Sequence, residues 1–125
     1  MKAELAIYAL LQGFAGGRVY PLLAPQDGPL PCVVYSRISA ERWRSTTGPS
    51  GMAQARIQVD VYDIGYAPAK ALADNIRSAL DGLRGEAGGV RIGGLSLISD
   101  RDFMESTPMP ALYRVSMDFL MTYEE

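Results

Sequence analysis

The segment ARIQVDVYDI, residues 55–64, alternates apolar and polar side chains more regularly than any other stretch of the chain. Ile57, Val59 and Val61 stand at every second position, with charged or amide side chains between them. Successive side chains of a β-strand point to opposite faces, so this period of two predicts a strand with one buried face. The final segment, ALYRVSMDFLMTYEE at 111–125, has the same period and predicts a second such strand. The outward face of the sheet is expected to carry polar side chains of mixed charge: Arg56, Gln58, Asp60, Arg114, Ser116 and Asp118.

Two further strands are predicted from weaker patterns. CVVYSRISAERW, residues 32–43, is rich in β-branched and aromatic side chains. The Gly-Pro and Ser-Gly breakers in RSTTGPSG, residues 44–51, predict a flexible loop, which would join this strand to the next as a hairpin. VRIGGLSLIS, residues 90–99, is interrupted by two glycines at 93–94, which predict a bulge or a second turn.

Two segments have the period of a helix. KAELAIYALLQ, residues 2–12, places apolar side chains at intervals of three and four, and glycines follow it. YAPAKALADNIRSALDGL, residues 66–83, combines an apolar stripe with a charged opposite face, and Pro68 suits a first helical turn. Between the first helix and the first strand, VYPLLAPQDGPLP at 19–31 is expected to be an extended, proline-stiffened arm that lies against a neighbouring molecule, or a surface connection packed on its own domain.

The elements therefore follow the order α-β-β-α-β-β, which predicts an α+β protein. We expect one domain over residues 1–125, because single domains most often have about 100–150 residues. An antiparallel sheet of four strands, with both helices packed on one face, would bury the apolar stripes of all six elements.

Composition excludes most catalytic mechanisms. The 125 residues include no histidine and one cysteine, and the formal net charge is −2. Without histidine there is no Ser-His or Cys-His pair and no general base of the usual kind. No secretion signal or membrane span is recognised. Cys32 is predicted to be a small buried side chain, and the acidic SDRDFMES, residues 99–106, to be a solvated strand end rather than a metal site. We therefore expect no enzyme activity, catalytic site, cofactor or metal.

Aromatic and arginine side chains are concentrated around the predicted hairpin. Tyr, Trp and Arg are the residues that protein–protein interfaces prefer, so a partner-binding hairpin is favoured. A stacking platform for single-stranded nucleic acid is disfavoured by the acidic balance. The residues concerned are Tyr35, Trp43, Tyr62 and Tyr66, with Arg37, Arg42, Arg44 and Arg56.

An ordered set of motifs carries a resemblance to a known family. AIYALLQG at 6–13 is followed by GGRVY at 16–20, a proline-containing link, and PCVVYSRIS at 31–39. The block GPSGMAQARIQVDVYDIGYAPAKALADNIRSALDG at 48–82 comes next, and SDRDFMES with ALYRVSMDFLMTYEE closes the chain. Over nearly its whole length the sequence resembles the tail completion, or tail terminator, proteins of long-tailed bacteriophages and prophages, small head-tail joining proteins formerly known only as a domain of unknown function.

The resemblance implies a structural virion protein that is made in the host cytoplasm. Such a subunit forms a closed ring of six at the head-proximal end of the tail, stops polymerisation of the tail tube and joins the tail to the head. Its implied partners are further copies of itself, the major tail tube protein and the head connector or stopper protein, while DNA passes through the lumen without specific binding. A heterologous interface whose rotation closes would make such a ring.

Candidate contacts with these partners follow from the arm, the hairpin and the sheet. Two other functions stay open. One is a head-side stopper or adaptor, or the equivalent part of a gene-transfer agent or phage-like contractile particle; the other is a host adaptor that binds peptides at a sheet edge. The candidate contact residues are Tyr20, Leu22, Leu23, Pro25, Arg37, Trp43, Arg44, Thr47, Pro49, Arg56 and Tyr62.

Overall fold

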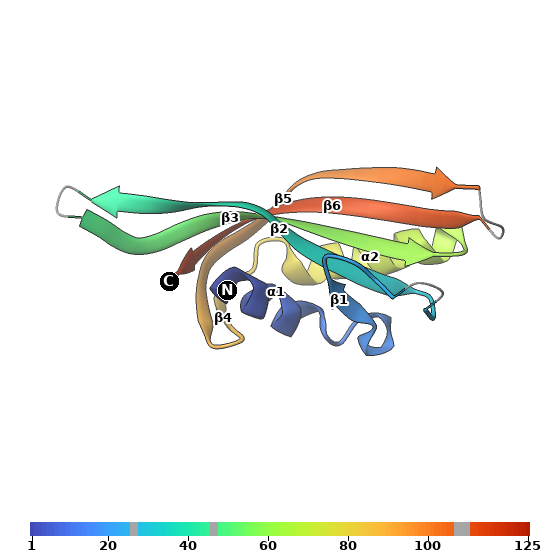
Figure 1. Ribbon diagram of the computed structural model, residues 1–125, viewed down its shortest axis with the longest axis horizontal. Coiled ribbons are helices and arrows are strands. Elements are labelled where there is room, and N and C mark those ends of the chain that lie inside the picture. The colour runs from blue at the N-terminus through green and yellow to red at the C-terminus, as the bar shows by residue number, and fades with distance from the viewer. Residues whose placement is uncertain (26–27, 46–47, 107–110) are drawn as a thin grey trace.

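A computed structural model of the protein describes residues 1–25, 28–45, 48–106 and 111–125. It contains one curled sheet and two α-helices (Figure 1). In chain order the elements are α1 (Lys2–Leu11), the short 3₁₀ helix η1 (Ala15–Gly17), β1 (Val19–Pro21), β2 (Cys32–Ser45), β3 (Gly48–Asp63), α2 (Tyr66–Leu80), β4 (Gly85–Ala87), β5 (Val90–Glu105) and β6 (Leu112–Glu124).

The sheet has six strands in the order β1-β2-β3-β6-β5-β4, so the expected four-stranded, mainly antiparallel sheet is wrong, although the class remains α+β. β1 pairs with β2 in parallel, opposite Val33–Tyr35, and makes the sheet mixed. β4 pairs antiparallel with the start of β5 through a two-residue turn at Gly88 and Gly89. Each added strand has three residues, too few for a period of two to be visible in the sequence.

The central strands are longer than expected. β2 and β3 continue through most of the predicted 44–51 loop, and Arg44 is opposite Pro49 in their register. β5 runs to Glu105 and so includes most of the acidic segment that was expected to be a solvated strand end. The register shift between Ile92 and Gly94 confirms a bulge at the two glycines. Figure 1 shows the distal ends of β2 and β3, up to Ser45 and from Gly48, extending well beyond the helices.

The hydrophobic core lies between the sheet and the two helices. Both helices are on the same side of the sheet, and no helix or strand of the described chain covers the other side (Figure 1). The predicted buried faces of the 55–64 and 111–125 strands are confirmed, since their alternate apolar side chains are fully enclosed. Fully enclosed core residues include Ile7, Leu11, Ile57, Val59, Val61, Ile76, Leu80, Met117, Phe119 and Met121.

Polar contacts fix α2 against the sheet. The Tyr66 hydroxyl donates a 2.9 Å hydrogen bond to Asp102 Oδ2, and Lys70 Nζ donates to Oδ1 at 3.2 Å. These hydrogen bonds raise the pKa of both the Tyr66 hydroxyl and the Lys70 ammonium, because both hold their protons toward the carboxylate. Asp102 therefore joins the distal half of β5 to the first turns of α2.

The β4–β5 turn contacts α1 at very short range. Gly88 and Gly89 both have positive φ, at 58° and 76°, which a two-residue type I′ hairpin turn requires. A Cβ on Gly88 would lie 2.6 Å from the carbonyl oxygen of Leu5 in α1, whereas a Cβ on Gly89 would have no heavy atom within 4 Å. Only glycine at position 88 allows α1 and this turn to approach so closely.

We expect Gly88→Ala to destabilise the protein more than Gly89→Ala. Both variants carry the cost of a left-handed alanine, about 1–2 kcal/mol, but only Gly88→Ala also forces α1 away from the turn, which adds roughly 1–3 kcal/mol. Urea unfolding of the two variants measures the difference. Equal losses of unfolding free energy would show that the close approach of α1 does not contribute to stability.

Candidate functional site

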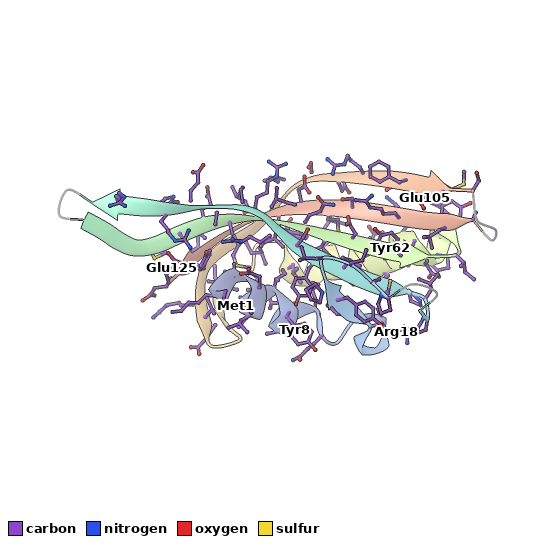
Figure 2. All side chains as sticks on the ribbon, in the orientation of Figure 1. Met1, Tyr8, Arg18, Tyr62, Glu105 and Glu125 are labelled. Carbon is purple, nitrogen blue, oxygen red and sulfur yellow. The ribbon has the colours of Figure 1, made fainter. Side chains whose placement is uncertain are left out.

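The uncovered side of the sheet carries a row of charged side chains. We call this side the outer face; its central residues come from β3, β6 and β5. Figure 2 shows side chains projecting from this side with no element above them. The central residues of the outer face are Arg56, Gln58, Asp60, Tyr62, Ser99, Arg101, Phe103, Arg114, Ser116 and Asp118.

Two aspartates on this face are buried although no helix covers them. Asp60 is 6% exposed and Asp118 is 4% exposed, so the expectation of a plainly solvated polar face is wrong at these positions. Neighbouring strands of a sheet are about 4.8 Å apart, and long side chains on both sides enclose a short one between them. The carboxylates form the floor of the face, and arginine side chains lie around them.

Each buried carboxylate is paired with arginine. Asp118 Oδ2 is 2.9 Å from Arg56 Nη2 and 3.8 Å from Arg101 Nη1, and it also accepts a 3.3 Å hydrogen bond from Ser99 Oγ. Asp60 Oδ2 is 3.3 Å from Arg114 Nη2. Buried carboxylates require such partners, because an isolated charge out of water is strongly destabilising.

Aromatic rings complete the pairing at one end of the row. The guanidinium of Arg114 lies 4.9 Å from the Phe103 ring centroid and 5.9 Å from that of Tyr62, which places it within cation–π distance of both. Burial raises the pKa of the Tyr62 hydroxyl, and the charge of Arg114 partly opposes that rise. Arg114 is thus held by one carboxylate and two rings.

Some hydrogen-bonding capacity on the floor is unused within the described protein. Asp118 Oδ1, Ser116 Oγ and Arg114 Nε are buried and have no hydrogen-bond partner among the described residues. Buried polar atoms normally have partners, so these three atoms are open to water or to a further polar partner.

The described distal part of the β2–β3 hairpin, residues 43–45 and 48–51, is a second candidate surface, which we call the hairpin arm. Here β3 has passed the end of β6, whose last pairing is Met52 with Glu124. A register shift between Arg42 and Arg44 places a bulge at Trp43, which is 43% exposed. A shallow pocket at the base of the arm is lined by Arg42, Trp43, Arg44, Gly51, Met52 and Glu125. Within it, Arg42 Nε is 2.9 Å from Glu125 Oε1.

The segment after β1 is a third candidate surface. The backbone N–H of Leu22 donates to the carbonyl of Tyr35 at 2.8 Å, and Arg18 Nε donates to the carbonyl of Pro31 at 2.8 Å. Both ends of this connection are therefore attached to its own domain. Leu22 and Leu23, in contrast, are 76% and 82% exposed, which is unusual for adjacent leucines.

The predicted contact residues fall into these three regions and do not form one surface. Tyr20 is half-buried in β1, and Pro25 is exposed near the two leucines. Arg37 is exposed on the helix side, 3.8 Å from Glu4. Trp43, Arg44 and Pro49 belong to the hairpin arm, and Arg56 and Tyr62 to the outer face. Thr47 lies outside the described residues.

The predicted cluster of aromatic residues around the hairpin is wrong. Tyr35 packs on the helix side against Tyr8, with ring centroids 6.2 Å apart. Tyr66 begins α2 and lies 5.6 Å from the ring of Tyr113, while Tyr62 is on the outer face and Trp43 is in the arm. The four residues lie in or next to the two strands of the predicted hairpin, but their side chains are on different faces, since successive side chains of a strand point to opposite sides.

Sequence reasoning missed Arg101 and Phe103 as members of the outer face. The segment 99–106 was predicted to be a solvated strand end, and the structure places it, exposed, at the end of β5; the sequence did not show that it also pairs across to β6. The signal was present in DRDF, where Arg101 and Phe103 alternate with the aspartates. Extending the period of two by four residues would have placed both on the same face as Ser99.

No group of three or more potential metal ligands comes together in the described part of the chain. Cys32 is buried, as predicted, and burial raises the pKa of its thiol. Among the described residues, no helix has the length and apolar character needed to cross a membrane. The described surfaces offer contacts for macromolecules: a charged sheet face, a projecting hairpin and an exposed pair of leucines.

Comparison with solved structures shows that the fold is that of a virion subunit. A chain in the virion of a native gene transfer agent particle superimposes with a TM-score of 0.72 at 24% identity, over 96% of this chain and 92% of that chain. The family model for tail completion protein gp17 matches residues 1–124, and the chain belongs to this family. No curated protein matches it. The protein is therefore a structural component of a phage-type tail and part of the virion.

We expect Asp118→Ala to lower the free energy of unfolding by about 1–3 kcal/mol, because two arginines and a serine lose their shared acceptor. Asp74→Ala is the matched control, since Asp74 is largely exposed and lies 3.9 Å from Arg77 on the same helix. That change should stay within about 0.5 kcal/mol. If urea unfolding gave the same result for both, the outer-face pairs would contribute nothing to stability.

Proposed function

We propose that the protein forms a closed ring of six subunits at the head-proximal end of the tail, where it ends polymerisation of the tail tube and joins the tail to the head. Membership of the tail completion family supports a role at this position. The ring would contact the tube protein on one side and the head connector or stopper on the other. Among the described features, the sheet with two unlike open edges gives this proposal its main structural support.

The open edges arise because the edge strands are short. β1 covers only Val33–Tyr35 of β2, and β4 covers only Val90–Ile92 of β5. No described strand pairs with the outer edge of β2 over residues 36–42, or with that of β5 over residues 98–105. At Leu95 and Leu97 the connection after α2 occupies the β5 edge, because Gly82 N–H donates to the Leu95 carbonyl at 2.7 Å and Leu97 N–H donates to Asp81 Oδ1 at 2.9 Å. Unpaired strand edges are templates for pairing with another chain.

Strand direction and level make the two edges complementary. Three antiparallel pairings separate β2 from β5, so the two strands run in opposite directions. Following the registers across the sheet, Ser36 lies at the level of Ser99, and Ala40 lies at the level of Leu95. Copies placed side by side in one orientation would bring the β2 edge at Ser36 of one subunit beside the β5 edge at Ser99 of the next, antiparallel, with the Asp81–Gly82 connection occupying the adjoining edge at Leu95 and Leu97. Such a contact is heterologous, and a heterologous contact makes a ring when its rotation closes.

Deletion of the gene tests the proposal directly. We expect electron microscopy of the resulting particles to show over-long tube polymers beside tailless, DNA-filled heads, because nothing stops the tube or attaches it. Tails of normal length on intact particles would contradict the proposal. Free tails of normal length beside separate heads would indicate a head-side stopper instead.

The exposed leucines give a residue-level test. We expect the double change Leu22→Ser and Leu23→Ser to leave the fold intact, since both side chains are exposed, but to fail in complementing the deletion. Particles should again carry over-long tubes, because the segment after β1 lies beside the β2 edge and would contact the neighbouring subunit. Ile64→Ser, at an aliphatic site after β3 that is also exposed (57%), is the control and should restore normal tails. Full rescue by the leucine variant would remove this segment from the interface.

A further inference from the structure

The outer face has charges at its centre, whereas a protein–protein interface usually has few there. Arg56, Arg101 and Arg114 come from three neighbouring strands, β3, β5 and β6, and their side chains are 44%, 51% and 29% exposed beside the two buried carboxylates. The core of a protein interface is typically depleted of charge and enriched in apolar groups. A row of guanidiniums on an open sheet is instead the chemistry that binds phosphodiester oxygens.

The carboxylates oppose such binding. Asp118 Oδ2 contacts both Arg56 and Arg101, and Asp60 Oδ2 contacts Arg114, so each guanidinium already has an anionic partner. Both aspartates are nearly inaccessible to solvent, and a phosphate cannot displace them as it would displace a mobile counterion. The affinity of a protein for DNA depends on arginines and lysines that exchange counterions for phosphates, and an arginine with a fixed carboxylate has much less to gain.

We propose that the outer face is a surface over which double-stranded DNA passes, and that Asp60 and Asp118 mask its three arginines so that the DNA is not retained. The inference rests on the proposed ring, because a ring at the head-tail joint provides the passage. The unpartnered Asp118 Oδ1, Ser116 Oγ and Arg114 Nε fit a face that is completed by solvent or a passing polar polymer rather than by an apolar partner.

The test uses the free subunit and a short random-sequence DNA duplex, measured by fluorescence anisotropy between about 50 and 200 mM salt. We expect the native protein to bind weakly and Asp60→Asn/Asp118→Asn to bind at least about tenfold tighter. A plot of the logarithm of its DNA-binding constant against the logarithm of the salt concentration should have a slope steeper by up to about three, one for each unmasked arginine. Adding Arg56→Gln and Arg114→Gln to that variant should remove most of the gain.

The control is Asp74→Asn/Glu86→Gln, which changes the net charge by the same amount at exposed sites on α2 and β4. It should leave affinity close to that of the native protein. Equal gains in both double variants would show that net charge alone matters and would overturn the proposal, as would tight binding by the native protein or no gain in a variant that circular dichroism shows to be folded. If the double variant does not fold, the single changes replace it. Asp118→Asn should steepen the slope of log binding constant against log salt concentration by up to about two, and Asp60→Asn by up to about one.

This experiment and the gene deletion fail independently. Duplex binding requires neither a ring nor a particle. Normal tails after deletion of the gene would therefore refute the ring without changing the DNA affinities measured for the free subunit and its variants. Conversely, the gene deletion could give over-long tubes while the folded double variant gains no affinity for DNA. That pair of results would support the terminator role and refute the masking.

Discussion

The structure depends on a sheet that is apolar on one face and charged on the other. Alternation along β3 and β6 imposes this asymmetry, because every second side chain of these central strands is apolar. The apolar face must be covered, and α1 and α2 cover it with Ile7, Leu11, Ile76 and Leu80. Gly88 and Asp102 then fix the distance and position of the helices, one by allowing close approach and the other by accepting hydrogen bonds from α2.

The buried carboxylates of the charged face must find their partners on the face itself, since no described helix or strand covers it. Asp60 and Asp118 do so by pairing with arginines on their own and neighbouring strands, and Arg114 gains two aromatic contacts in addition. The pairing is a structural requirement, because unpaired buried carboxylates would destabilise the sheet. It also leaves the face nearly neutral in its local charge balance. One set of contacts thus stabilises the sheet and, in the masking that we propose, also prevents retention of a polyanion.

The edges of the sheet connect the fold to assembly. Proteins usually protect their edge strands, and three-residue strands such as β1 and β4 protect only a small part of β2 and β5. In a free monomer, long open edges are a liability for aggregation. In the ring that we propose they would meet neighbouring chains, and the exposed Leu22 and Leu23 follow β1 on the same β2 edge.

The sequence by itself determined the two helices, the four long strands, the buried face of the sheet and, through ordered motifs, the family. These features have local periods of 3.6 or two residues that a single segment displays. Only the tertiary structure decided that Val19–Pro21 joins the sheet in parallel, that Gly85–Ala87 forms the opposite edge, and that the face containing Asp118 is enclosed. A three-residue strand is stabilised by a partner distant in the chain, and the burial of a short aspartate is set by arginines on adjacent strands. Neither property belongs to a segment alone, so no local pattern could reveal it.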